Sequence, residues 1–142
     1  MLGIIISGHG EFASGFEKTL EYIVGQQEKI KYINFNNGMG TEELEKRFNE
    51  AIQELDEKEG VLFLTDLAGG TPFSTAVSLS QEKGNIKVIG GTNLPSVLSA
   101  LELREEGECS EIIRDILIHA KNSLLVFEEP VSNVLADEID GI

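Results

Sequence analysis

The fold of this chain is decided by residues 61–73, which read VLFLTDLAGGTPF. Their first five residues form an apolar, strand-forming run, which is typical of a strand buried on both faces of a sheet. Asp66 follows this run, and two glycines then permit a tight, exposed turn of the backbone. Thr71 is placed to cap a helix through its hydroxyl, and Pro72 suits the first helical position. The segment therefore predicts a strand, an acidic loop and a helix start in direct succession.

The start of that helix is suited to binding an anion. Its first backbone N–H groups lack intrahelical partners, and the helix macrodipole adds partial positive charge there. Gly69 and Gly70 come directly before it and leave the backbone open to a ligand. An acid on the same loop suggests phosphate chemistry around a group that the acid orients. The candidate for that group is His9, which lies between Gly8 and Gly10.

Strand-like and helix-like segments alternate along the rest of the chain. Strands are expected at residues 2–7, 30–35, 61–65 and 86–89, and each precedes a segment with apolar residues at helical spacing. This alternation indicates an α/β sheet with right-handed crossovers. The number of units suits a flavodoxin-like open, mostly parallel sheet of order 2-1-3-4 with helices on both faces. Residues 124–127 predict a short antiparallel strand at the edge of that sheet.

His9 and Asp66 end neighbouring strands in this order, at the point where the chain reverses direction. We therefore expect them on adjacent loops at the carboxyl edge of the sheet. Imidazole is nucleophilic near neutral pH, and an acid bonded to one ring nitrogen would fix the tautomer and free the other nitrogen. A loop histidine that only packs is the alternative interpretation at this point. His119, on a predicted helix away from that edge, is expected to be structural.

The composition limits the classes of function. The 142 residues fit one domain, and the net charge of −14 argues against binding to nucleic acid or to anionic membrane surfaces. The single cysteine, Cys109, excludes an intramolecular disulfide, and without a Cys/His cluster a structural zinc site is not expected. The apolar residues 2–6 are too short for a signal peptide. We expect a cytoplasmic protein with one domain at residues 1–128 and an acidic tail at residues 129–142.

Two other phosphate-binding interpretations fit the residues less well. Residues 8–13, GHGEFA, match the dinucleotide fingerprint G-x-G-x-x-G/A. The second strand, however, ends in Asn36 and Asn37 rather than in the acid that holds a ribose hydroxyl. A phospho-aspartate receiver needs an acidic pair after the first strand, where this chain has SGH.

Four segments resemble the IIA component of the mannose-type sugar phosphotransferase system. They follow in the expected order, at residues 4–10 (IIISGHG), 61–66 (VLFLTD), 69–73 (GGTPF) and 91–95 (GTNLP). Each segment alone is unspecific, whereas their combination is specific. The resemblance extends over residues 1–128 and implies the same flavodoxin-like fold.

The resemblance also implies a function. In this family the histidine after the first strand takes a phosphoryl group from the carrier protein HPr and passes it to a histidine of the IIB component. His9 matches that residue, Asp66 matches the aspartate bonded to it, and Thr71 matches a position that contacts the phosphoryl group. No metal-binding constellation is apparent in the sequence, so we expect direct transfer without a metal or a cofactor. The resemblance further implies that the membrane components IIC and IID are indirect partners. Further contacts to the phosphoryl group are expected from Gly8, Gly69 and Gly70.

The resemblance carries an expectation about assembly and leaves alternatives open. Family members are typically dimers that exchange the last strand, which corresponds here to residues 123–127. Ala68 departs from the family, because this position is aromatic in some members, so the rim of the pocket is expected to differ. No IIB domain follows residue 128, which predicts a free-standing IIA component. The alternatives are a subunit of a dihydroxyacetone kinase, a tetrapyrrole-chelatase-like metal enzyme and a non-catalytic ligand-binding module. The sequence does not identify the sugar.

Overall fold

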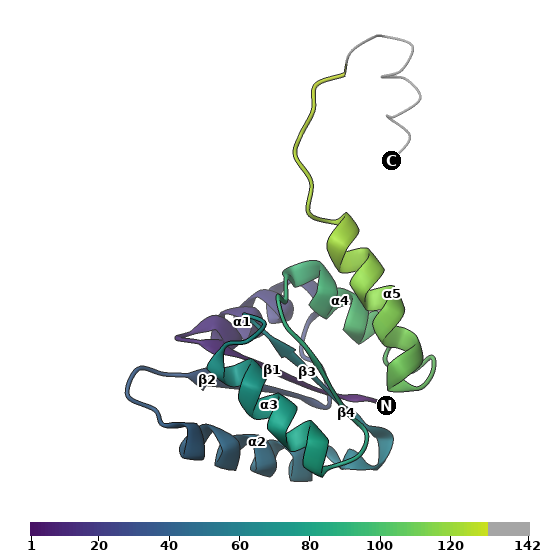
Figure 1. The fold of residues 1–142 in the computed structure, drawn as a ribbon. Helices are drawn as coiled ribbons and strands as arrows, with labels where there is room; N and C mark the ends of the chain where they lie inside the picture. The colour runs from purple at the N-terminus through teal and green to yellow at the C-terminus, as the bar shows by residue number, and fades with distance from the viewer. Residues whose placement is uncertain (131–142) are drawn as a thin grey trace.

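A computed structural model of the chain describes residues 1–130 and shows a three-layer α/β fold (Figure 1). The sheet order is β2-β1-β3-β4, and every pair of neighbouring strands is parallel. This order confirms the predicted flavodoxin-like sheet. β1 and β3 lie side by side, with Ser7 opposite Thr65, so their carboxyl ends meet at one edge. The strands are β1 (Gly3–His9), β2 (Ile30–Phe35), β3 (Val61–Thr65) and β4 (Ile86–Ile89).

Helices cover both faces of the sheet, as predicted (Figure 1). One face is covered by α1 (Phe12–Val24), α4 (Leu94–Leu103) and α5 (Cys109–Asn122). The opposite face is covered by α2 (Thr41–Leu55) and α3 (Thr71–Glu82). A short 3₁₀ turn, η1 (Glu57–Glu59), leads into β3.

The central strands are buried on both sides because each face of the sheet has its own apolar core. In β1, the side chains of Ile4 and Ile6 pack beneath α1, α4 and α5, whereas Ile5 between them packs beneath α2 and α3. All three side chains are fully buried. Burial of apolar surface contributes about 25 cal/mol per Å², so these strands anchor the fold and hold the loops at their ends in place. The continuous apolar runs in the sequence follow from this double burial.

The start of α3 differs from the prediction by one residue. Gly70, in an extended conformation (φ −74°, ψ 171°), is the N-cap, and Thr71 is the first helical residue. The prediction that the Thr71 hydroxyl caps α3 is therefore wrong, because no side chain caps this helix. Pro72 lies in the first turn, as expected. The Thr71 hydroxyl is consequently not used by the helix.

The predicted edge strand at residues 124–127 is not formed within the described chain. After α5 the chain leaves the body of the protein as an irregular segment (Figure 1). Its apolar side chains are between 75% and 86% exposed: Leu124, Leu125, Val126 and Phe127. Residues 131–142 of the predicted acidic tail lie outside the described residues.

Candidate active site

His9 and Asp66 meet at the carboxyl edge of the sheet, as the strand order requires. His9 is the last residue of β1, and Asp66 follows the last residue of β3. The Nδ1 atom of His9 lies 2.8 Å from Oδ2 of Asp66. The same carboxylate oxygen accepts the backbone N–H of His9 at 2.8 Å, and Oδ1 accepts the backbone N–H of Leu67 at 2.8 Å. Both oxygens are therefore held, and the carboxylate cannot rotate away without losing several hydrogen bonds.

These hydrogen bonds keep Asp66 ionised. Burial raises the pKa of its carboxyl, but the hydrogen bonds from the His9 backbone, the His9 ring and the Leu67 backbone lower it by more. The pKa therefore lies below its ordinary value. An ionised carboxylate only accepts hydrogen bonds, so Nδ1 of His9 carries the hydrogen that Asp66 receives.

The other imidazole nitrogen, Nε2, is left open. It has no hydrogen-bond partner in residues 1–130, and the His9 side chain is 46% exposed, compared with 13% for Asp66. The ring of Phe35 contacts the imidazole edge-on, with centroids 5.6 Å apart and an interplanar angle of 78°. His9 is thus fixed by Asp66 and Phe35, while its Nε2 stays unpaired among the described residues on a side chain that is nearly half exposed. This is the arrangement expected of a positioned nucleophile.

The start of α3 lies against the same imidazole. A Cβ atom on Gly70 would lie 3.1 Å from Cε1 of His9, so glycine lets the helix end approach the ring. Gly69 has a φ of +86°, in the left-handed region that favours glycine. Ser74 is the first residue whose N–H reaches back along the helix, donating to the Gly70 carbonyl at 2.9 Å.

The donors at this helix end have no acceptor among residues 1–130. The N–H groups of Thr71 and Phe73 precede the first helical hydrogen bond and have no intrahelical partner. The hydroxyl of Thr71 forms no hydrogen bond with other described residues. Together with the helix macrodipole, these groups make a site for a tetrahedral anion beside the open nitrogen.

Gly8 supports the site through packing. Its position is buried, and a Cβ atom there would lie 2.5 Å from Cδ1 of Phe12. Phe12 therefore packs directly over the end of β1, next to the histidine. A contact of Gly8 with a phosphoryl group stays a prediction.

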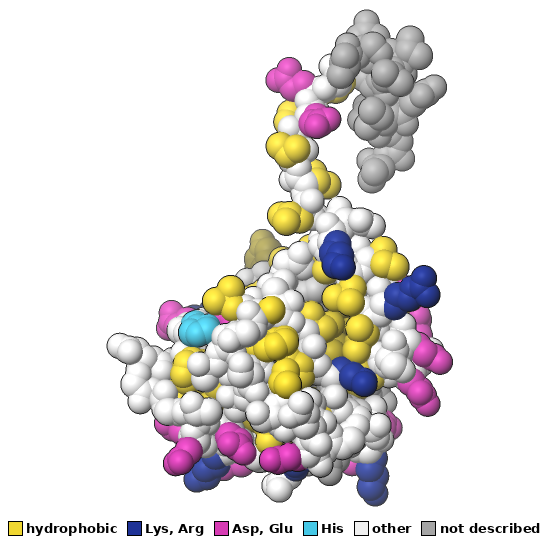
Figure 2. Space-filling view, in the orientation of Figure 1, with side chains coloured by type: hydrophobic (Ala, Val, Ile, Leu, Met, Phe, Trp, Pro, Cys, Tyr) yellow, Lys and Arg dark blue, Asp and Glu magenta, His cyan; other side chains and the backbone are white. Residues whose placement is uncertain are grey.

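An apolar surface beside His9 was not predicted from the sequence. A groove of about 300 Å³ runs along α1 to the start of α4. Leu67, directly after Asp66, is also 60% exposed. An exposed histidine lies close to hydrophobic side chains in the space-filling view (Figure 2). The apolar groove is lined by Phe12, Gly15, Phe16, Thr19 and Leu94.

His119 lies apart from this site. Its Nδ1 atom is 2.6 Å from the hydroxyl of Ser99, which joins α5 to α4. No group of three His, Cys, Asp or Glu side chains within residues 1–130 could hold a metal ion. No helix in the same part of the chain combines the length and the apolar character needed to cross a membrane.

Comparisons with known proteins agree with this geometry. The family described as "PTS system fructose IIA component" matches residues 3–117. The fructose-specific EIIA component of Bacillus subtilis is 31% identical over 134 residues, which is 94% of this chain and 92% of that protein. The chain belongs to the mannose-type EIIA family.

Two further relatives extend the comparison. The EIIA chain is 36% identical over 105 residues to the mannose-specific EIIAB component of Escherichia coli K12, covering 74% of this chain and 32% of that longer protein. A crystal structure of the EIIA component from Streptococcus agalactiae superposes with a TM-score of 0.84 at 32% identity, covering 89% of this chain and 98% of that one. The protein is thus a phosphoryl carrier in sugar uptake, which confirms the predicted family and carrier role.

Proposed function

We propose that His9 is the phosphoryl acceptor of this EIIA component, and that it receives the group from HPr and passes it to a IIB component. The observation that carries the proposal is the hydrogen bond between Nδ1 of His9 and Asp66, which leaves Nε2 open beside the start of α3. Direct exchange between imidazoles requires positioning and charge stabilisation more than covalent work by the protein. The site supplies both.

The transfer step follows from the tautomer. The Nε2 lone pair of His9 attacks the phosphorus of the donor phosphohistidine. The new N–P bond forms as the donor N–P bond breaks, and the donor imidazole leaves with that electron pair as a neutral ring. Because Nδ1 of His9 keeps its hydrogen, the product is a phosphorylated imidazolium, whose positive charge the Asp66 carboxylate stabilises. Transfer to the IIB histidine is the same exchange in the opposite direction.

The phosphoryl oxygens have donors ready at α3. Thr71 offers its hydroxyl and its backbone N–H, and Phe73 offers a backbone N–H. Gly69 and Gly70 allow the oxygens to approach the backbone closely. Such donors act where charge develops during transfer, and they are already oriented before the reaction begins. In this proposal the step needs neither a metal ion nor a cofactor.

The partners would dock over the apolar groove and Leu67. The net charge of −14 favours partners with a basic face, which an acidic protein attracts over a distance. In this proposal the protein has no direct contact with the membrane components IIC and IID, because it passes its phosphoryl group to IIB. We place the carrier in the cytoplasm, because its phosphoryl groups originate from phosphoenolpyruvate, a metabolite of the cell interior.

We also propose a homodimer in which residues 123–127 are exchanged between two carrier domains, each comprising residues 1–128. The exposed apolar side chains at residues 124–127 support the exchange, because an unpaired apolar segment is a liability for a soluble domain. β4 is one of the two edge strands of the sheet, and an apolar cavity of about 310 Å³ beside it is bordered by Ile89, Leu117 and Leu124. A symmetric exchange would cover this edge.

Sedimentation of two proteins tests the dimer. The full chain is expected to sediment as a dimer at micromolar concentration. A chain that ends after Asn122 lacks the exchanged segment and is expected to be monomeric or unstable. A monomeric full chain at that concentration would overturn the proposal.

Reconstitution tests the carrier function. The protein is incubated with enzyme I, HPr and labelled phosphoenolpyruvate, and an acid-labile, base-stable phosphohistidine is expected only when HPr is present. Adding a cognate IIB component should remove the label from this protein. Absence of label in the complete mixture would contradict the proposed function.

A further inference from the structure

The loop between β4 and α4, residues 90–93, lies against the loop that carries Asp66. The N–H of Gly91 donates to the Asp66 carbonyl at 3.1 Å, and the N–H of Thr92 donates to the Thr65 carbonyl at 3.0 Å. Both carbonyls belong to the turn from β3 into the acidic loop. Residues 90–93 therefore support the backbone that carries the Asp66 carboxylate, and within the described part of the chain they form no hydrogen bond with His9.

Gly90 brings the two loops into direct backbone contact. A Cβ atom at this position would lie 2.7 Å from Cα of Ala68 and 2.9 Å from its nitrogen. Backbone atoms cannot swing aside as the end of a long side chain can, so any larger residue would push the Asp66 loop outward. Gly91 has a φ of +75°, in the left-handed region, which turns the chain so that its N–H meets Asp66.

Asn93 fixes the other end of this loop to two helices. Its Oδ1 accepts the N–H of Ser96 at 3.0 Å, and its own N–H donates to the Ser96 hydroxyl at 3.1 Å, which forms a capping box at α4. Its Nδ2 donates to the carbonyl of Ala120 in the last turn of α5 at 3.1 Å. The loop thus rests on a rigid base formed by α4 and α5.

We propose that residues 90–93 are a positioning element that sets the Asp66 carboxylate against Nδ1 of His9 and so maintains the reactive tautomer. This inference rests on the proposed role of His9 as phosphoryl acceptor. The element acts through Asp66 and contacts neither the phosphoryl group nor the imidazole. Misplacement of a reacting group by about 1 Å can cost about 100-fold in rate, so a displaced Asp66 loop should slow transfer strongly.

The variant Gly90→Ala tests the proposal, with Gly84→Ala as the matched control. A Cβ atom on Gly84, in the exposed turn before β4, meets nothing within 4 Å. We measure the rate of phosphoryl transfer from HPr and the imidazole ¹⁵N signals of His9 in the unphosphorylated protein. Gly90→Ala is expected to transfer about 10- to 100-fold more slowly and to lose the pure Nδ1–H tautomer, whereas Gly84→Ala keeps both wild-type properties.

Thermal unfolding shows whether Gly90→Ala is folded. If it is not, Asn93→Ala takes its place, because it removes the side-chain hydrogen bonds to Ser96 in α4 and to Ala120 in α5 without adding an atom. A folded variant of either kind with the wild-type tautomer and the wild-type rate would overturn the proposal. The tautomer measurement needs no donor protein. A wild-type protein that accepts no phosphoryl group would therefore refute the proposed function while the positioning role is still decided by the ¹⁵N signals.

Discussion

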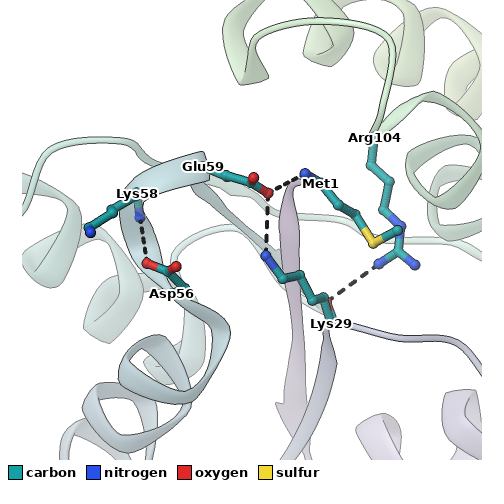
Figure 3. Close-up of polar contacts among 6 residues, drawn as sticks. All are labelled: Met1, Lys29, Asp56, Lys58, Glu59 and Arg104. Atoms are coloured by element: carbon teal, nitrogen blue, oxygen red, sulfur yellow. Dashed lines mark hydrogen bonds and ion pairs between the residues drawn. The ribbon is translucent and has the colours of Figure 1, made fainter.

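Each end of the parallel sheet carries a cluster of polar and charged groups, and the two clusters differ in whether all their groups are paired. At the amino end, Glu59 binds both the Met1 ammonium and Nζ of Lys29, the latter at 3.3 Å (Figure 3). Arg104 donates to the Lys29 carbonyl at 3.4 Å, which links this cluster to the end of α4. At the carboxyl end, Asp66 holds one nitrogen of His9 and leaves the other open. One cluster pairs its groups with each other, and the other keeps a reactive atom available.

The difference shows why chemistry belongs to the carboxyl end. Parallel strands run there into loops and helix starts, whose free N–H groups receive anions. At the amino end the start of α5 also has N–H groups without intrahelical partners, but the nucleophile beside them is a thiol, Cys109, and not an imidazole. The surroundings of Cys109, the candidate nucleophile near the amino end, lower its reactivity. Burial raises the pKa of its thiol to about 11, against a weaker opposite effect of Lys87, so the thiol stays neutral.

The largest effect is expected for His9→Ala. This variant removes the only nitrogen that the account assigns to the phosphoryl group, so phosphorylation should be abolished. His9 packs at the surface, and the fold should be retained, which circular dichroism would check. His119→Ala is the matched control and should still accept phosphate. Full labelling of His9→Ala would refute the assignment.

Asp66→Asn should have the next largest effect. The amide still accepts a hydrogen bond from Nδ1 but no longer carries the negative charge that stabilises the phosphorylated imidazolium. We expect transfer to slow by about 100-fold while the site still takes the label. Stopped-flow or quench kinetics with phosphorylated HPr would measure the rate. An unchanged rate would make Asp66 a bystander.

Thr71→Val should have a moderate effect. The substitution keeps the branched shape at the start of α3 and removes only the hydroxyl, which has no other task in residues 1–130. Loss of one hydrogen bond to a charged group costs about 1.5–3 kcal/mol, so transfer should slow by about tenfold or more. Ser78→Ala, on the same helix but farther from His9, is the control.

Glu59→Gln, at the amino end, should have the smallest effect and none on transfer. Hydrogen bonds from the Met1 ammonium and from Lys29 lower the pKa of Glu59 below 4.5. A lowered pKa means that the ion pairs stabilise the fold above pH 4.5 and that this contribution is lost as the pH falls through the folded-state value. Wild type should therefore melt slightly higher than Glu59→Gln at pH 7, and the difference should disappear in acid. Slower transfer in Glu59→Gln would contradict the claim that the cluster at the amino end has no part in phosphoryl transfer.

Much of the site could be predicted because its signals are local. The apolar runs predicted the strands, and the predicted strand order placed His9 next to Asp66, as the structure shows. The N-cap of α3 was misplaced by one residue, because Gly70 and Thr71 are both acceptable there and the choice depends on how closely the helix approaches His9. The support from residues 90–93 was also missed, since a contact between two loops leaves no periodic pattern in the sequence.

The apolar groove and the end of the chain escaped prediction for a different reason. Phe16 has the helical spacing of a core residue, and only the position of α4 decides which part of α1 stays open. The apolar residues 124–127 predict a strand, but a strand needs a neighbour, and residues 1–130 of one chain supply none there. Sequence shows which segments are apolar, whereas their partners are set by the assembled fold.

The most direct test of the central claim is an NMR measurement on the phosphorylated protein with ¹⁵N-labelled histidine. Phosphorylation by HPr should place the phosphoryl group on Nε2 of His9, with Nδ1 still protonated and bonded to Asp66, and should leave the signals of His119 unchanged. A phosphoryl group on Nδ1 of His9, on His119 or on an aspartate would contradict the account.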